Sequence, residues 1–453
     1  MIFSSLFFIF VFFPIVFFLF AMSNQRYKIS VLLFASFLFY FWGEQSFIIV
    51  ILGSILVNYS FGLVIESSKK KKLYLSVGIM INLVLIFYFK YALFFLSNLG
   101  NHSFDNIDIH LPLGISFYTF HNISYLFDIY RGEIFADRSL LRFSFYISFF
   151  PQLIAGPIVR YSEVFHSLTR LKSNYKEIFD GFCLFAQGLG KKVIIANTLG
   201  IYADEIFSTD FSLFGSGVAW FGILSYSFQI YFDFSGYSDM AIGLGRIFGL
   251  KFPINFNFPY SALSIQDFWR RWHISLSTWF RDYLYIPLGG NRIGQTRQFF
   301  NLILVFLCCG FWHGASWNFL IWGIYHGFFL VLERTGYQRI LSLLPTFLKI
   351  LLNFGLINIG WVFFRTGTLT DSYSFIKILF GENGFGLPQM ISTFDFRWLL
   401  GMLISLLFAF EWRFFNTLAN NLYLFRAFSL AVFMVSIFFL VANNYNPFIY
   451  FRF

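Results

Sequence analysis

Long apolar runs separated by short polar stretches make up most of this 453-residue chain. Runs of roughly 18 apolar residues or more recur, and each can cross a bilayer as a helix. The clearest runs cover residues 2–21, 29–43, 47–65, 73–96, 347–364, 396–411 and 426–442. With the less regular runs between them, they predict roughly ten to twelve membrane helices. A β-barrel would need short alternating segments instead.

The first run and the loops after it indicate an orientation. Residues 2–21 follow no basic segment and precede further spans at once, so we expect a span, not a cleavable signal peptide. The loop at residues 69–72 is four lysines, whereas loop 97–110 holds Asp105 and Asp108 and no lysine or arginine. Because basic loops stay in the cytoplasm, this pattern predicts an external N-terminus.

Between residues 111 and 260 the helical pattern loosens. Proline and glycine interrupt the apolar segments 111–116 and 150–157. Broken helices at membrane depth occur where they pack in protein or line a cavity. Segment 159–180 is polar enough for a loop or a surface helix. The prediction is an all-α polytopic membrane protein with additional re-entrant or interfacial helices, forming one membrane domain over residues 1–453.

Composition agrees with this class. The chain is 58% hydrophobic and 12% charged, with a mean hydropathy of +0.69, against about 25% charged residues in a globular domain. The net charge of +10 is explained by basic cytoplasmic loops, and no nucleic-acid-binding motif accompanies it. The chain has an odd number of cysteines, Cys183, Cys308 and Cys309, and their spacing is not that of metal ligands. Neither a disulfide framework nor a metal site is therefore expected.

Polar chemistry gathers in residues 265–327. If 265–283 is one helix, a single stripe holds Gln266, Arg270, His273, Ser277 and Arg281. An interfacial amphipathic helix would explain the arginines and tryptophans at headgroup level. It would not explain a titratable histidine within the stripe. Such a helix could also form one wall of a reaction chamber.

His313 lies in an uncharged run, residues 298–332. Gly310 and Gly314, four residues apart, would let another helix pack closely on that face. A single histidine in such a run is usually a packing residue, and His326 fits that role. His313 differs because His273 accompanies it: an imidazole can take a proton from a hydroxyl and return it to a leaving group, as acyl transfer requires.

Two further carboxylates, Asp233 and Asp239, lie in an apolar run. They could line a polar cavity, or they could be paired structurally, for instance Asp239 with Arg246. The sequence supports both interpretations equally. The glycine-rich segment 243–249 misses the dinucleotide-binding spacing by one residue, so it is expected to serve helix packing.

The chain resembles the membrane-bound O-acyltransferase family, in particular the bacterial branch of alginate and peptidoglycan O-acetylation membrane proteins. The passages that carry the resemblance are residues 111–116 with 128–132, 150–160, 267–292 and 310–327. The resemblance implies that His313 is the catalytic histidine and His273 its partner, in a tunnel open from both sides. It also implies acetyl-CoA as the cytoplasmic donor and a periplasmic SGNH-type acetyltransferase with a Ser-His-Asp site as partner.

We therefore expect an O-acyltransferase of the bacterial inner membrane that transfers acetyl toward hydroxyls of an exported polysaccharide, with no bound cofactor or metal. The acceptor would be an alginate-like polymer, peptidoglycan or another envelope glycan. Arg270 and Arg271 would bind anionic groups of the donor or anchor to lipid headgroups. The other expected substrate-binding residues are Gln266, Ser277, Trp312 and Asn318. The alternatives are transfer of another acyl group, such as D-alanine onto teichoic acid, and a transporter without chemistry.

Overall fold

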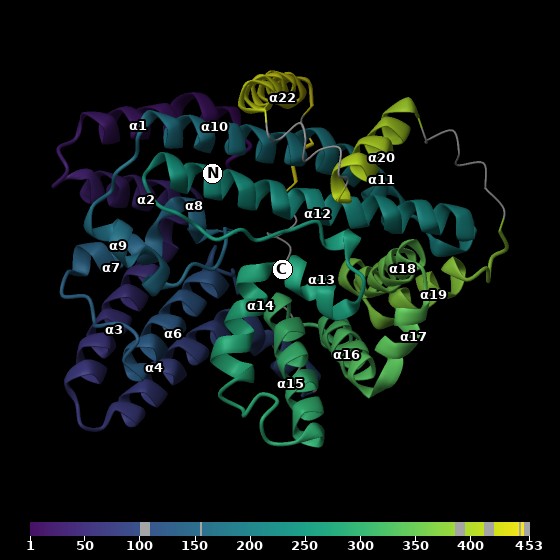
Figure 1. Cartoon of the computed structure of the whole chain (residues 1–453), viewed down its shortest axis with the longest axis horizontal. Helices are drawn as coiled ribbons and strands as arrows, with labels where there is room; N and C mark the ends of the chain where they lie inside the picture. The colour runs from purple at the N-terminus through teal and green to yellow at the C-terminus, as the bar shows by residue number, and fades with distance from the viewer. Residues whose placement is uncertain (100–108, 155, 386–394, 412–420, 444, 448–453) are drawn as a thin grey trace. The chain divides into compact units, whose positions relative to one another are not determined.

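A computed structural model describes residues 1–99, 109–154, 156–385, 395–411, 421–443 and 445–447. Helices and irregular segments form all of this described part, and no strand occurs in it. The chain divides into two compact units. Unit 1 comprises Met1–Phe185 and Tyr237–Ile254, and unit 2 comprises Ala186–Gly236 and Asn255–Phe453. Figure 1 shows the helices with their labels.

The apolar runs of the sequence become helices at nearly the predicted positions. In unit 1 these are a π-helix at Phe8–Phe12 with α1 (Phe13–Met22), α2 (Lys28–Glu44), α3 (Ile48–Ser67), α4 (Lys71–Ile86) and α5 (Ala92–Asn98). Four helical stretches among the described residues are long and apolar enough to cross a membrane: Lys28–Ser67, Lys71–Asn98, Thr346–Arg365 and Leu422–Ala442. Phe8–Met22 and Phe396–Ala409 are shorter apolar helices. The predicted loop 97–110 lies mostly outside the described residues.

Buried amides tie the helices of unit 1 together. Asn58 on α3 and Asn82 on α4 exchange hydrogen bonds of 3.2 and 2.7 Å. Asn122 on α6 (Ile115–Arg131) donates to Ser54 Oγ at 2.9 Å. Such interhelical hydrogen bonds supplement van der Waals packing where water is absent.

The predicted helix breaks at residues 111–116 and 150–157 are present. Gly114 has a φ of +74°, and α6 begins directly after it. A β-carbon at Gly114 would lie 2.4 Å from the carbonyl oxygen of Leu153, the last residue of the four-residue helix α8 (Phe150–Leu153). A side chain at 114 is therefore excluded by both the backbone conformation and the neighbouring carbonyl.

The remaining helices of unit 1 occupy the more polar segments. They are α7 (Leu140–Ser148) and α9 (Tyr161–Thr169), followed by the first part of α10 (Tyr175–Gly190). Gly243 on α12 (Ser216–Ile247) would place a β-carbon 2.5 Å from the carbonyl oxygen of Gly181 on α10. The glycine-rich segment 243–249 thus serves helix packing, as predicted.

Unit 2 contains the end of α10, the first part of α12 and the helices named next. These are α11 (Asn197–Ser208), α13 (Ile265–Arg271), α14 (Ile274–Phe280), α15 (Gln295–His313), α16 (Trp317–Leu332), α17 (Gln338–Leu343), α18 (Thr346–Arg365), α19 (Leu369–Leu379), α20 (Phe396–Ala409) and α22 (Leu422–Ala442). Several are too short to span a bilayer. The predicted count of membrane helices and the tunnel remain predictions.

Glycines bring α15 and α16 into close contact, which confirms the prediction for Gly310, whereas Gly314 lies beyond the end of α15. A β-carbon at Gly310 would lie 2.1 Å from the carbonyl oxygen of Phe319, and one at Gly323 would lie 2.3 Å from that of Phe306. The two helices therefore approach backbone to backbone, and they lie side by side in Figure 1. This contact fixes the end of α15, where His313 is located.

Candidate active site

The helix predicted over residues 265–283 is broken at Trp272 and His273. Helix α13 ends at Arg271 and α14 begins at Ile274, while His273 has left-handed φ and ψ of 42° and 55°. The single polar stripe was therefore a wrong prediction. The break lets the neighbouring chain segment bind the freed backbone groups: Asn257 N donates to Arg271 O, and Ile274 N donates to Asn255 O, both at 2.9 Å.

Left-handed backbone in a residue with a side chain is uncommon and costs about 1 to 2 kcal/mol. It persists where the surrounding structure enforces it, and such residues gather at functional sites. His273 is fully buried. The break thus turns its ring into the interior of unit 2, while Arg270 remains exposed.

Asn255 holds the ring of His273. The Oδ1 atom of Asn255 accepts hydrogen bonds from the Ser275 backbone N–H at 3.1 Å and from the Ser275 hydroxyl at 2.9 Å. It also lies 3.2 Å from His273 Nδ1. Because a backbone N–H can only donate, the amide orientation is fixed, and the proton of a neutral His273 is assigned to Nδ1. The lone pair is then on Nε2, which is buried and has no partner among the described residues.

Trp312 is the common neighbour of His273 and His313. Its ring centroid lies 6.2 Å from that of His273 and 4.9 Å from that of His313. The imidazole of His313, which is 5% exposed, also meets Trp322 at 5.2 Å and Phe364 at 5.0 Å. The two histidines selected from the sequence therefore border one buried aromatic cluster.

Phe234 forms another wall around His273, with ring centroids 4.6 Å apart. The preceding residue, Asp233, pairs with Lys192 at 2.6 Å, and both side chains are 2% exposed. Lys192 also donates to Asn197 Oδ1 at 2.8 Å. For Asp233 the structure thus supports the paired interpretation, with a lysine that the sequence analysis did not consider.

His326 lies in a ring of aromatic side chains. Its centroid is 5.0 Å from Trp322 and 5.1 Å from Trp269. Neither ring nitrogen has a hydrogen-bond partner among the described residues. Because α15 ends at His313 and a new helix begins at Trp317, the two histidines do not share one helix. His326 packs as the sequence analysis expected.

The other predicted substrate-binding residues are separated in space. Gln266 and Arg270 line a cavity of about 310 Å³ together with Lys349. Arg271 is instead engaged in ion pairs with Asp267 at 3.0 Å and with Glu411 at 3.4 Å.

Ser277 and Asn318 make hydrogen bonds within the protein. The Ser277 hydroxyl donates to Trp272 O at 3.4 Å. The Asn318 amide donates to Thr366 O at 2.8 Å and to Ser372 Oγ at 3.3 Å, which ties α16 to the junction of α18 and α19. Of the expected substrate-binding residues, Trp312 is the one whose ring meets both histidines in the described part of the chain.

Two residues that position the site were missed by sequence reasoning. Asn255 lies in an irregular segment where no periodicity distinguishes it. Glu333 accepts hydrogen bonds from Ile265 N at 2.5 Å and Gln266 N at 3.0 Å, so it caps the start of α13 from the end of α16. Glu333 is the first charge after the uncharged run 298–332, which was a signal available in the sequence.

Comparisons with known proteins place these residues in context. The family model of membrane-bound O-acyltransferases matches residues 4–366, a range that includes His273 and His313. The chain is 41% identical over 401 residues to the probable alginate O-acetylase AlgI of Pseudomonas aeruginosa, covering 86% of this chain and 77% of that protein. It is 42% identical over 395 residues to the peptidoglycan O-acetyltransferase of Helicobacter pylori, covering 79% and 75%. A teichoic acid D-alanyltransferase of Bacillus subtilis is 32% identical over 228 residues, covering 47% and 56%.

Proposed function

This chain belongs to the membrane-bound O-acyltransferase family, and we propose that it moves acetyl from cytoplasmic acetyl-CoA to hydroxyls of an exported polysaccharide. It is an O-acyltransferase with membrane character. The observation that carries the proposal is the meeting of two buried histidines at Trp312. A transporter without chemistry would have no evident need of that pair.

In the proposed reaction His313 is the base. It takes the proton of the acceptor hydroxyl as the oxygen forms a bond to the acetyl carbonyl carbon. The carbon–sulfur bond then breaks, and His313 returns the proton to the CoA thiolate. His273 presents an acceptor nitrogen, Nε2, and would orient a hydroxyl or amide donor of one substrate. Trp312 would hold the two imidazoles apart and exclude water.

The donor would enter at the basic end of unit 2. The cavity with Gln266, Arg270 and Lys349 shares Gln338 and Ser342 with a neighbouring cavity of about 610 Å³ that Arg334 and Arg339 line. Guanidinium groups bind phosphates well, as the phosphates of CoA would require. Basic ends of membrane helices also favour the cytoplasm. Both points support placing this end inside the cell, in the bacterial inner membrane.

Acetyl is the acyl group best supported by the relatives. The alginate and peptidoglycan enzymes that resemble this chain over most of its length are named as O-acetylating proteins. A periplasmic SGNH-type partner would receive or deliver the group on the outer side. The second candidate is transfer of D-alanine to teichoic acid, favoured only by a relative that covers 47% of this chain.

The test uses membrane vesicles with equal amounts of wild-type, His313→Ala or His166→Ala protein. His166 is an exposed histidine in α9 and serves as the matched control. Acetyl-labelled CoA is supplied on the cytoplasmic face and label in envelope polysaccharide is counted. We expect a loss of about 10²- to 10⁴-fold in His313→Ala only. Equal labelling in all three would contradict the role of His313, and D-alanyl transfer without acetyl transfer would favour the second candidate.

A further inference from the structure

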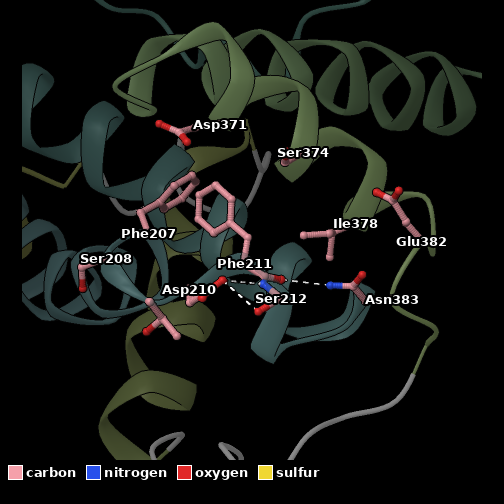
Figure 2. A pocket seen from close by; sticks show the side chains of 11 residues that line it. Phe207, Ser208, Asp210, Phe211, Ser212, Asp371, Ser374, Ile378, Glu382 and Asn383 are labelled. Carbon is pink, nitrogen blue, oxygen red and sulfur yellow. Dashed lines mark hydrogen bonds between the residues drawn. The ribbon is translucent and has the colours of Figure 1, made fainter.

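A third cavity in unit 2, of about 670 Å³, lies between the end of α11, the turn Phe211–Leu213 and helix α19. Its size is within the about 300 to 1,000 Å³ typical of sites for small molecules. Figure 2 shows its side chains: the rings of Phe207 and Phe211 together with the carboxylates of Asp210, Asp371 and Glu382.

The cavity lies at the end of α16 and α18 opposite to the basic cavities. Asn318, in the first turn of α16, bonds Thr366 just after α18, and Tyr325 farther along α16 bonds Leu356 earlier in α18. The two helices are therefore antiparallel. Lys349 lies at one end, and helix α19, which begins just after Arg365, lines the third cavity at the other. If the basic end faces the cytoplasm, this cavity faces outward.

The lining supplies mainly hydrogen-bond acceptors, and one of its carboxylates, Glu382, pairs with Lys377. Three carboxylates and the hydroxyls of Ser208, Thr209 and Ser374 line it, and no lysine or arginine is among the described lining residues. The Ser212 backbone N–H and hydroxyl both donate to Asp210 Oδ1 at 2.9 Å. These two bonds hold the pKa of Asp210 below its ordinary value, so this carboxyl stays ionised. Asp210 and Asp371 therefore favour a ligand that donates hydrogen bonds and carries no negative charge.

The aromatic wall of the cavity is fixed in place. Phe207 stacks on Phe375 with ring centroids 4.5 Å apart, and the Arg365 guanidinium lies 5.0 Å from the Phe207 ring. The Asn383 amide donates to Phe211 O at 2.9 Å and to Phe214 O at 3.0 Å, which fixes the turn. A preorganised apolar wall beside ionised acceptors suits a pyranose ring, which has apolar C–H faces and donating hydroxyls at its edge.

Chain neighbours of residues at the cavity also contact the candidate active site. Phe364, whose ring meets His313 at 5.0 Å, directly precedes Arg365 in the last turn of α18. Ser372, which Asn318 bonds, directly follows Asp371 in α19. Helix α18 thus supplies Phe364 to the aromatic cluster around His313, and helix α19, which follows it in the chain, supplies Asp371, Ser374 and Ile378 to the cavity.

From this geometry we infer that the cavity is an outward-facing subsite for a sugar unit that bears hydroxyls and no carboxylate. The inference rests on the proposed function, because it names the class of glycan that reaches the enzyme. A neutral or amine-bearing sugar would bind through charge-assisted hydrogen bonds to Asp210 and Asp371. A uronate polymer would meet like charges and be repelled here.

The test measures oligosaccharide binding by the full-length protein in lipid nanodiscs. The probes are chitotetraose, which is neutral, and tetramannuronate, which is a uronate of equal length. We expect wild-type protein to bind chitotetraose at least about tenfold more tightly, and Asp371→Asn to lose about tenfold of that affinity. Ser374→Trp, which fills the cavity, should abolish binding. Glu133→Gln, an exposed change in unit 1, should leave it unchanged.

Transfer of labelled acetyl is measured on the same samples. The subsite predicts that His313→Ala loses transfer and still binds chitotetraose. Active wild-type protein that binds neither probe, or both equally, would overturn the subsite while leaving the proposed function standing. Unchanged binding in Ser374→Trp would overturn it as well. Binding without transfer in the wild type would instead count against the proposed function.

Discussion

Asn255 Oδ1 lies 3.2 Å from His273 Nδ1 and is fixed in that position by two donors from Ser275. The pair sets which nitrogen of His273 carries the proton, because the oxygen can only accept. The chemistry proposed for His273 depends on the lone pair that this leaves on Nε2. Asn255 thus acts on the reaction through His273 and is a positioning residue.

Replacing Asn255 by leucine should lower kcat about 10- to 100-fold, a range typical when a partner that orients a functional histidine is lost. The KM for acetyl-CoA should change little, since Asn255 is not among the residues that line the basic cavities. Asn255→Asp keeps the acceptor oxygen and should retain more activity than the leucine variant. The check is steady-state transfer from labelled acetyl-CoA across a range of pH. Equal activity in both variants would show that the acceptor oxygen is irrelevant.

The left-handed backbone of His273 allows the chemical and conformational roles of this residue to be separated. Asparagine tolerates this conformation better than alanine does. His273→Asn should therefore unfold at a higher temperature than His273→Ala. The difference in their free energies of unfolding should be about 1 kcal/mol. Both variants lack the imidazole and should lose most activity. Thermal unfolding in detergent and the transfer assay measure the two effects independently; an active His273→Asn enzyme would rule out a chemical role for the ring.

The close approach of α15 and α16 makes Gly310 intolerant of a side chain. A β-carbon there would lie 2.1 Å from Phe319 O, so Gly310→Ala must push the helices apart. Overpacking of this kind typically costs about 1 to 3 kcal/mol and would displace His313. Gly355 in α18 is the matched control, because a β-carbon added there would meet no described atom within 4 Å. Gly310→Ala should lower both the yield of monodisperse protein and its unfolding temperature. Gly355→Ala should leave both unchanged.

The sequence predicted the spans and singled out His313 because each leaves a local signal, whereas His273 was selected from a polar stripe that the fold breaks. Apolar runs of membrane length mark α2, α3, α18 and α22, and a histidine in an uncharged run is conspicuous at any position. Gly310 likewise marked the face on which another helix packs closely, and α16 is that helix. These features depend on neighbours within a few residues, which periodicity can report.

The break at His273 could not be predicted in this way. It is stabilised by Asn255 and Asn257, which pair with the freed backbone only after the chain has folded back. The pairing of Asp233 with Lys192 joins residues 41 positions apart, as their numbering shows, with no motif between them. Long-range partners decide these features, so local propensity favoured one continuous amphipathic helix where the fold needs two short ones.

The buried pair of Lys192 and Asp233 gives the last prediction. Both side chains are 2% exposed, and their charged atoms lie 2.6 Å apart. Lys192→Met alone removes one charge of the buried pair, which typically costs about 3 to 5 kcal/mol. The double variant Lys192→Met with Asp233→Leu removes both charges and should recover most of that loss, since a buried pair often contributes little net stability. Unfolding temperatures of the wild type, both single variants and the double variant form a double-mutant cycle.

If the pair serves structure alone, the double variant should also regain acetyl transfer. Stability recovered without activity would instead give these charges a part in the reaction beside His273, whose ring packs on the adjacent Phe234.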